Sequence, residues 1–171
     1  MSFFKGFGYA FLGILHCIKN ERNMRFHTVA ALYVLVFARF FDFSCSEWLV
    51  LFLTIGAVIA AEMINTAIEE LCDKVTQETD PHIKHSKDAA AGAVLVLAIF
   101  AAVIGVFLFW NAEGWIRLYT FYMTHPWNLT AVVLLAVCSV FYIVWGPVGL
   151  KERCRGKKNS SMERKKKHDK D

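Results

Sequence analysis

The sequence predicts an all-α membrane protein, and three observations support this fold class. Hydrophobic residues make up 56% of the 171 residues and the mean hydropathy is +0.40, which is too apolar for an ordinary soluble domain. The apolar residues fall in blocks whose lengths approach the roughly 20 residues that a helix needs to cross about 30 Å of hydrocarbon. Basic residues gather on alternate connections between these blocks. The length corresponds to a single domain.

The N-terminal segment 4–19 is predicted to form an amphipathic surface helix. Its phenylalanine and aliphatic residues recur at helical spacing and lysines flank them, which is typical of a helix that lies in a membrane interface. The residues on this repeat are Phe4, Phe7, Phe11, Leu15 and Ile18.

Four further segments are predicted to span the membrane. The first, 28–43, is the weakest because Arg39 interrupts it. The second, 48–72, begins with fourteen uncharged residues and ends in acidic ones. The third, 89–110, has 22 residues without a charge and is the clearest of the four. The fourth, 127–147, is nearly as apolar.

The segments that connect these spans differ in composition. Residues 74–86 are polar and are predicted to form a cytoplasmic loop. Residues 111–126 are rich in Trp and Tyr, as expected of a connection that lies at the membrane interface. Residues 148–171 are strongly basic, and we predict a disordered tail held close to anionic headgroups.

The distribution of basic residues predicts the orientation in the membrane. Seventeen of the 19 Lys and Arg lie before the first span, between the second and third spans, or in the tail. The positive-inside rule makes that side the cytoplasm, so we expect a multi-pass protein of the cell membrane. The net charge of +4 therefore lies beside the membrane and gives no indication of nucleic-acid binding. The five cysteines show neither disulfide nor metal-ligand spacing.

Polar residues form a stripe at the end of the second predicted span. A carboxylate next to hydrocarbon is costly, so it normally faces a polar interior or has a function. The alternative is a span that ends just before Glu62 and continues as a solvated helix. That alternative explains Glu70, which lies off the stripe, but it explains Glu62 poorly because apolar residues follow it. The stripe, within a sector of about 80° at 100° per residue, consists of Glu62, Asn65, Glu69 and Asp73.

The spacing of the charged residues separates their possible roles. Glu62 and Glu69 are roughly 10.5 Å apart along a helix axis and cannot easily bind one metal ion together. A hard cation such as Mg²⁺ takes carboxylate oxygens together with phosphate, and Glu21 and Glu69 could supply the carboxylates. At the start of the third span, Asp88 is placed to cap the helix N-terminus, and Lys87 beside it would attract an anionic phosphate.

These residues resemble the motifs of the prokaryotic diacylglycerol kinase/undecaprenol kinase family of small membrane kinases. The stretch "EMINTAIE", 62–69, matches the family signature E-x-x-N-[ST]-A-I-E, and "HSKDAAAGAVLVLA", 85–98, matches its second motif. Residues 8–27 are similar to the family's N-terminal region. The resemblance runs from about Phe3 to Trp110, and the sequence lacks the P-loop motif of soluble nucleotide-binding kinases.

The resemblance implies a lipid kinase that uses ATP as co-substrate and Mg²⁺ as cofactor. It implies that Glu62 is the general base at the primary hydroxyl of a membrane lipid, and that Glu21 and Glu69 hold the Mg²⁺. It also implies a homotrimer whose active sites are shared between neighbouring subunits. The other matching positions are Tyr9, Lys87 and Asp88, which would contact the nucleotide, and Asn65, Asp73 and Arg25, which would support the site.

The chain departs from the family pattern after Trp110. We expect residues 1–110 to form a three-helix kinase core and 127–147 to form an extra transmembrane helix. The motifs favour undecaprenol as the substrate, with diacylglycerol as the alternative. Two non-enzymatic alternatives are a subunit of an oligomeric channel or transporter, with Glu62 and Asn65 along an ion path, and a structural anchor whose basic tail recruits anionic lipid.

Overall fold

A computed structural model describes residues 3–75, 80–125 and 127–147, and in this part of the chain all regular structure is helical. The predicted all-α membrane fold is confirmed. The predicted basic tail, 148–171, lies outside the described residues. The helices, in chain order, are α1 (Phe3–Asn20), α2 (Arg22–Ala38), α3 (Cys45–Val75), α4 (Pro81–Leu108), α5 (Ala112–Thr124) and a final helix, Trp127–Pro147.

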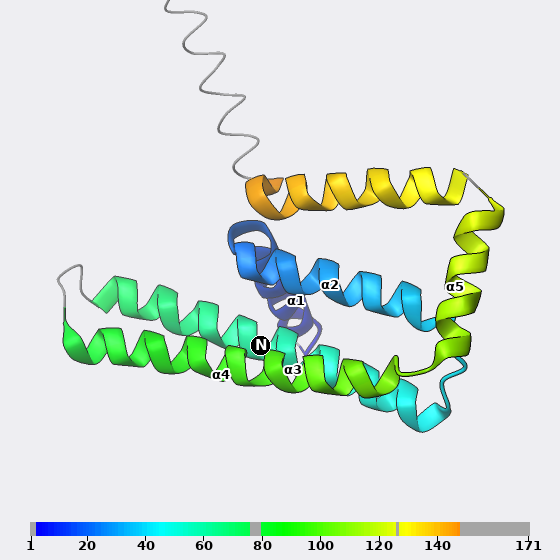
Figure 1. The fold of residues 1–171 in the computed structure, drawn as a ribbon. Coiled ribbons are helices and arrows are strands. Elements are labelled where there is room, and N and C mark those ends of the chain that lie inside the picture. Colours follow the sequence, from blue (N-terminus) through cyan, green and yellow to red (C-terminus); the bar gives the residue numbers. More distant parts are fainter. Residues whose placement is uncertain (1–2, 76–79, 126, 148–171) are drawn as a thin grey trace, which may run out of the picture.

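Four helices run along one common direction, and two run across it. Figure 1 shows α2, α3, α4 and the final helix roughly parallel or antiparallel to one another, with α5 crossing one end of the group. The α3–α4 hairpin has the most extensive contacts. At the end away from α5, α3 and α4 continue beyond α2 and the final helix (Figure 1). The helix α1 lies across the bundle beside the start of α2, partway along α3 and α4 (Figure 1). This arrangement suits a membrane bundle with an interfacial helix on each side.

Three of the described helices are long and apolar enough to cross a membrane: α3, α4 and the final helix. The first predicted span, 28–43, differs from the structure because α2 begins at Arg22 and ends at Ala38, after only 17 residues. The chain leaves the helix there because Phe41 is buried, 3% exposed, against the rings of Phe109 and Trp115. Burying an aromatic ring outweighs the few helical hydrogen bonds that are lost.

The long helices extend further than predicted at the end where the acidic residues lie. The predicted loop 74–86 is wrong over most of its length, because α3 continues to Val75 and α4 already begins at Pro81. Asp80 caps α4: its Oδ1 accepts hydrogen bonds from the backbone N–H groups of His82, at 2.7 Å, and Ile83, at 3.4 Å. Proline at the first helical position has the right φ and lacks only an N–H that would be unpaired anyway.

The predicted interfacial connection 111–126 is itself mostly helical, as α5. The side chain of Asn111 caps it by accepting a hydrogen bond from the N–H of Glu113. The helix packs closely against the turn after α2, since a methyl group at Gly114 would lie 2.3 Å from the ring of Phe41. An ion pair of 2.6 Å between Arg117 and Asp42 adds a polar contact at the same end.

Candidate active site

Buried polar side chains gather where α1 crosses α3. In the described residues the buried polar or charged residues are Arg25, Glu62, Asn65 and Thr66, and three of these four lie in the second half of α3. Glu62 is only 1% exposed. Since burying an unpaired carboxylate is costly, its position here requires a reason beyond packing.

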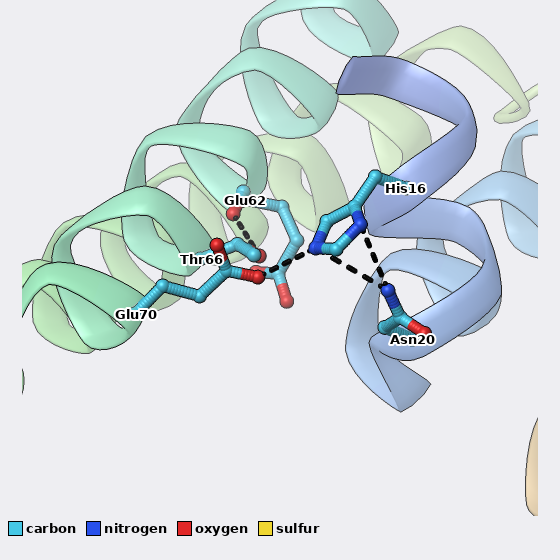
Figure 2. A network of polar contacts seen from close by, with 5 residues as sticks. All are labelled: His16, Asn20, Glu62, Thr66 and Glu70. Atoms are coloured by element: carbon cyan, nitrogen blue, oxygen red, sulfur yellow. Dashed lines mark hydrogen bonds and ion pairs between the residues drawn. The ribbon is translucent and has the colours of Figure 1, made fainter. Parts of the chain in front are cut away.

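The helix α1 covers Glu62 by packing across α3. The His16 ring pairs with the Glu70 carboxylate at 2.7 Å, and the Thr66 hydroxyl donates to the carbonyl of Glu62 at 3.0 Å. Figure 2 shows the Glu62 side chain pointing from α3 toward α1, beside the His16–Glu70 pair. The amide of Asn20 also bonds to His16, at 3.0 Å. Of these contacts, the His16–Glu70 pair joins α1 to α3 beside Glu62.

Two further carboxylates act electrostatically on Glu62. Glu69 follows it on α3, and Glu21 is the single residue between α1 and α2; the charges of both act on the Glu62 carboxylate. Glu21 has an extended backbone, with φ −93° and ψ 125°, and its side chain makes no capping hydrogen bond to α2. The side chain of Asn23 also interacts with Glu62. The structure therefore brings together three of the acids that the sequence singled out.

Asn65 orients Glu69 and keeps a free acceptor. Its Nδ2 donates to Oε1 of Glu69 at 2.9 Å. Its Oδ1 is buried and has no hydrogen-bond partner among the described residues. A buried amide oxygen without a partner is uncommon and suits a bound donor such as a hydroxyl or water.

The carboxylates around Glu62 have the ligand chemistry that Mg²⁺ prefers. Among the described residues no group of three or more His, Cys, Asp or Glu forms a complete metal cage. Mg²⁺ commonly takes only one or two carboxylates and completes its octahedron with phosphate oxygens and water. Glu21 and Glu69, the two carboxylates whose charge acts on Glu62, have ligand oxygens of this type.

Lys87 lies near this cluster but already has a partner. Its ammonium forms an ion pair with Asp73 across the α3–α4 hairpin, and its charge also acts on Glu69. An ammonium has three donors, so the pair with Asp73 leaves Lys87 able to contact an anion. Asp73, predicted as a supporting residue, holds Lys87 in place.

Of three other predicted residues, the structure corrects the prediction for one and locates the remaining two. Asp88 is exposed and sits two turns inside α4, so the prediction that it caps the helix is wrong. Tyr9 is 58% exposed on α1, and no described contact joins it to the carboxylates. Arg25 is 6% exposed and bonds to backbone carbonyls of Lys19 and Ile143, the latter in the final helix.

Sequence reasoning missed the pair that joins α1 to α3. Glu70 was expected to be a solvated surface acid; it is exposed, and it also contacts His16. The only signal in the sequence is that His16 and Asn20 are four residues apart and therefore share a helix face. Nothing in that spacing identifies Glu70 as the partner, because the contact depends on how α1 crosses α3.

Comparison with known proteins identifies the family. Residues 8–109 match the family model described as prokaryotic diacylglycerol kinase. The undecaprenol kinase of Bacillus subtilis (strain 168) is 43% identical over 107 residues, which cover 63% of this chain and 87% of that protein.

Two diacylglycerol kinases are also similar. That of Synechocystis sp. is 37% identical over 100 residues, covering 58% of this chain and 57% of that protein. That of Escherichia coli (strain K12) is 29% identical over 110 residues, which cover 64% of this chain and 90% of that protein. These names describe enzymes that phosphorylate a lipid alcohol, which excludes the channel and anchor alternatives as the main activity. The chain belongs to the prokaryotic diacylglycerol kinase family and is a lipid kinase that transfers phosphate to an alcohol.

Proposed function

We propose that this lipid kinase transfers the γ-phosphate of ATP to the primary hydroxyl of undecaprenol. The observation that carries the proposal is the buried Glu62 carboxylate at the end of the apolar part of α3, with no ion pair to it in the described part of the chain. The relative named undecaprenol kinase is 43% identical, and the two named diacylglycerol kinases above are 37% and 29% identical. This difference supports the polyprenol over diacylglycerol.

The residues around Glu62 suit phosphoryl transfer. The reaction needs an acceptor hydroxyl held in line with the γ-phosphate, a base for its proton and cations to offset the phosphate charge. Glu62 takes the proton from the lipid hydroxyl, and Lys87 contacts the phosphates. Glu21 and Glu69 would hold a Mg²⁺ ion, which would supply positive charge to offset that of the ATP phosphates. The assignment of Asp88 and Tyr9 to the nucleotide rests on the family resemblance.

An apolar cavity next to the site is suited to the lipid chain. It has a volume of about 290 Å³ and lies between α2, α3 and α4. Val58 and Ile59 line it, one turn before Glu62 on the same helix. Its other lining residues, which include Ala30, Ala101 and Gly105, are mostly small or aliphatic. A polyprenyl chain in this cavity would bring its hydroxyl toward Glu62.

The site is expected to face the cytoplasm, where ATP is available. The acidic half of α3 ends beside the first turns of α4, at the end of the bundle away from α5 (Figure 1). Basic residues also gather on this side, which the positive-inside rule assigns to the cytoplasm.

The test is phosphoryl transfer by the purified full chain in detergent micelles. The protein is mixed with γ-labelled ATP, Mg²⁺ and either undecaprenol or diacylglycerol. We expect label in both lipids, with a higher kcat/KM for undecaprenol. No label in either lipid would overturn the kinase proposal, and a higher kcat/KM for diacylglycerol would overturn the proposed substrate.

A further inference from the structure

Arg25 is a buried cation whose described partners are backbone carbonyls. Its Nη1 donates to the carbonyl of Lys19 at 2.9 Å, and its Nε and Nη2 donate to the carbonyl of Ile143 at 3.3 and 3.2 Å. No ion pair in the described part of the chain includes it. A guanidinium that is only 6% exposed therefore depends on carbonyls from two helices for its compensation.

Both carbonyls need a donor from outside their own helix. Lys19 lies in the last turn of α1, where helical carbonyls have no intrahelical partner. The usual donor to Ile143 would be the N–H of residue 147, which is a proline and has none. The negative ends of two helix dipoles thus meet at one positive side chain, which is a favourable arrangement.

The final helix is shaped to approach Arg25 closely. Gly146 has a φ of +55°, a conformation that favours glycine, and a methyl group there would lie 2.7 Å from Cζ of Arg25. A second contact, 3.1 Å between the hydroxyls of Tyr33 and Ser139, joins the same two helices further along. The final helix is therefore attached to α2 at two points.

These contacts surround the turn that carries Glu21. Lys19 lies just before Glu21 and Arg25 lies one turn after it, so the Arg25 side chain bridges the turn between α1 and α2. The bond to Ile143 ties this turn to the final helix, which lies beyond the 8–109 family match. Moving the guanidinium would change the angle between α1 and α2, and with it the position of the Glu21 carboxylate.

We propose that Arg25 and the final helix form a clamp, made of Arg25, the carbonyls of Lys19 and Ile143, and Gly146, that positions Glu21 for the metal–nucleotide complex. Arg25 is a positioning residue in this proposal. The inference rests on the proposed function, because it takes Glu21 as a magnesium ligand. It gives the extra helix a role in the reaction.

The test displaces the guanidinium without changing it. Gly146→Ala introduces a methyl group against Arg25, and Gly56→Ala is the matched control because a methyl group there meets no atom within 4 Å. We expect Gly146→Ala to raise the Mg²⁺ concentration for half-maximal activity about tenfold while the KM for lipid changes less than about twofold. Binding of Mn²⁺ with a non-hydrolysable ATP analogue, followed by electron paramagnetic resonance, should weaken by a similar factor.

A second variant covers the case in which Gly146→Ala does not fold. Arg25→Lys keeps the charge, but a single ammonium lacks the planar fork that joins two carbonyls, so we expect the same change in Mg²⁺ dependence. An unchanged Mg²⁺ requirement and Mn²⁺ affinity in a folded Gly146→Ala or Arg25→Lys protein would overturn the clamp. If the wild-type chain labels no lipid, the proposed function fails, and Mn²⁺ binding to the variants still tests the clamp separately.

Discussion

At the scale of single residues, Glu62 is the side chain on which the proposed chemistry depends most. Glu62→Gln keeps the size and polarity of the side chain but removes the group that accepts the proton. We expect kcat to fall by about 100-fold or more, as is usual when a general base is lost, with little change in the KM for ATP. Steady-state kinetics of the purified variant with both lipids measure this.

Glu70→Gln is the matched control for that substitution. Glu70 is half-exposed, pairs with His16 and lies on the same helix, and a glutamine there can still accept a hydrogen bond from the ring. Exposed pairs contribute about 0–1 kcal/mol, so kcat should stay within about twofold of wild type. A Glu62→Gln enzyme with near wild-type kcat would show that another group takes the proton.

Cys17 reports on the packing of α1 against α3. Burial raises the pKa of its thiol, and the nearby Glu70 carboxylate raises this pKa further. A raised pKa leaves less thiolate at neutral pH, so we expect slow alkylation by N-ethylmaleimide at pH 7.5 and a steady increase of the rate with pH. Cys45 is exposed and should react much faster. Equal rates at the two cysteines would mean that α1 does not stay packed on α3.

Helical spacing was sufficient to predict the stripe on α3 but not the contacts across helices. Glu62, Asn65 and Glu69 share one helix face, and a period of 3.6 residues specifies that face whatever the surroundings. The partners of Arg25 and Glu70 come from other helices, and no local pattern encodes them. The binding of Arg25 to Ile143 also depends on the extra helix, for which the family resemblance offered no guide.

At the scale of helices, the N-terminus of α4 offers a direct comparison between the structure and the sequence prediction. Asp80 caps the helix, so Asp80→Ala should lose two hydrogen bonds and about 1 kcal/mol of local stability. We expect amide hydrogen exchange over 82–86 to become about fivefold faster. Asp88→Ala, at the position predicted from sequence to be the cap, should leave this exchange unchanged. Faster exchange only in Asp88→Ala would contradict the structure.

Helix interiors were easier to predict than helix ends. Runs of apolar residues identified α3, α4 and the final helix because each run is long and uncharged. The ends depend on single contacts: α2 stops where Phe41 turns into an aromatic cluster, and α4 starts where Asp80 precedes Pro81. Asp80 followed by Pro81 is a typical helix start, but the polarity of residues 74–86 led us to predict a loop there.

At the scale of the whole molecule, the single chain leaves most of its apolar surface uncovered. Only 6% of the most apolar 18-residue stretch is buried in α4 and in the final helix, whereas 28% of the corresponding stretch is buried in α3. Lipid or other copies of the chain must cover the remaining apolar side chains, because water would not tolerate so many of them. A homotrimer, which we predicted from the family resemblance, would cover part of this surface.

A shared active site in such a trimer can be tested by mixing subunits. Glu62 and Glu69 lie roughly 10.5 Å apart along α3, so we expect the base of one subunit to act with the metal carboxylates of its neighbour. Glu62→Gln and Glu69→Gln proteins should each be inactive alone. The two variants are then mixed in equal amounts, unfolded together and reassembled. In a cyclic trimer with sites shared between neighbours, about a quarter of the sites would then combine an intact base with an intact Glu69. Recovery of about that share of kcat supports shared sites, whereas no recovery, with trimers shown by cross-linking, places each site within one subunit.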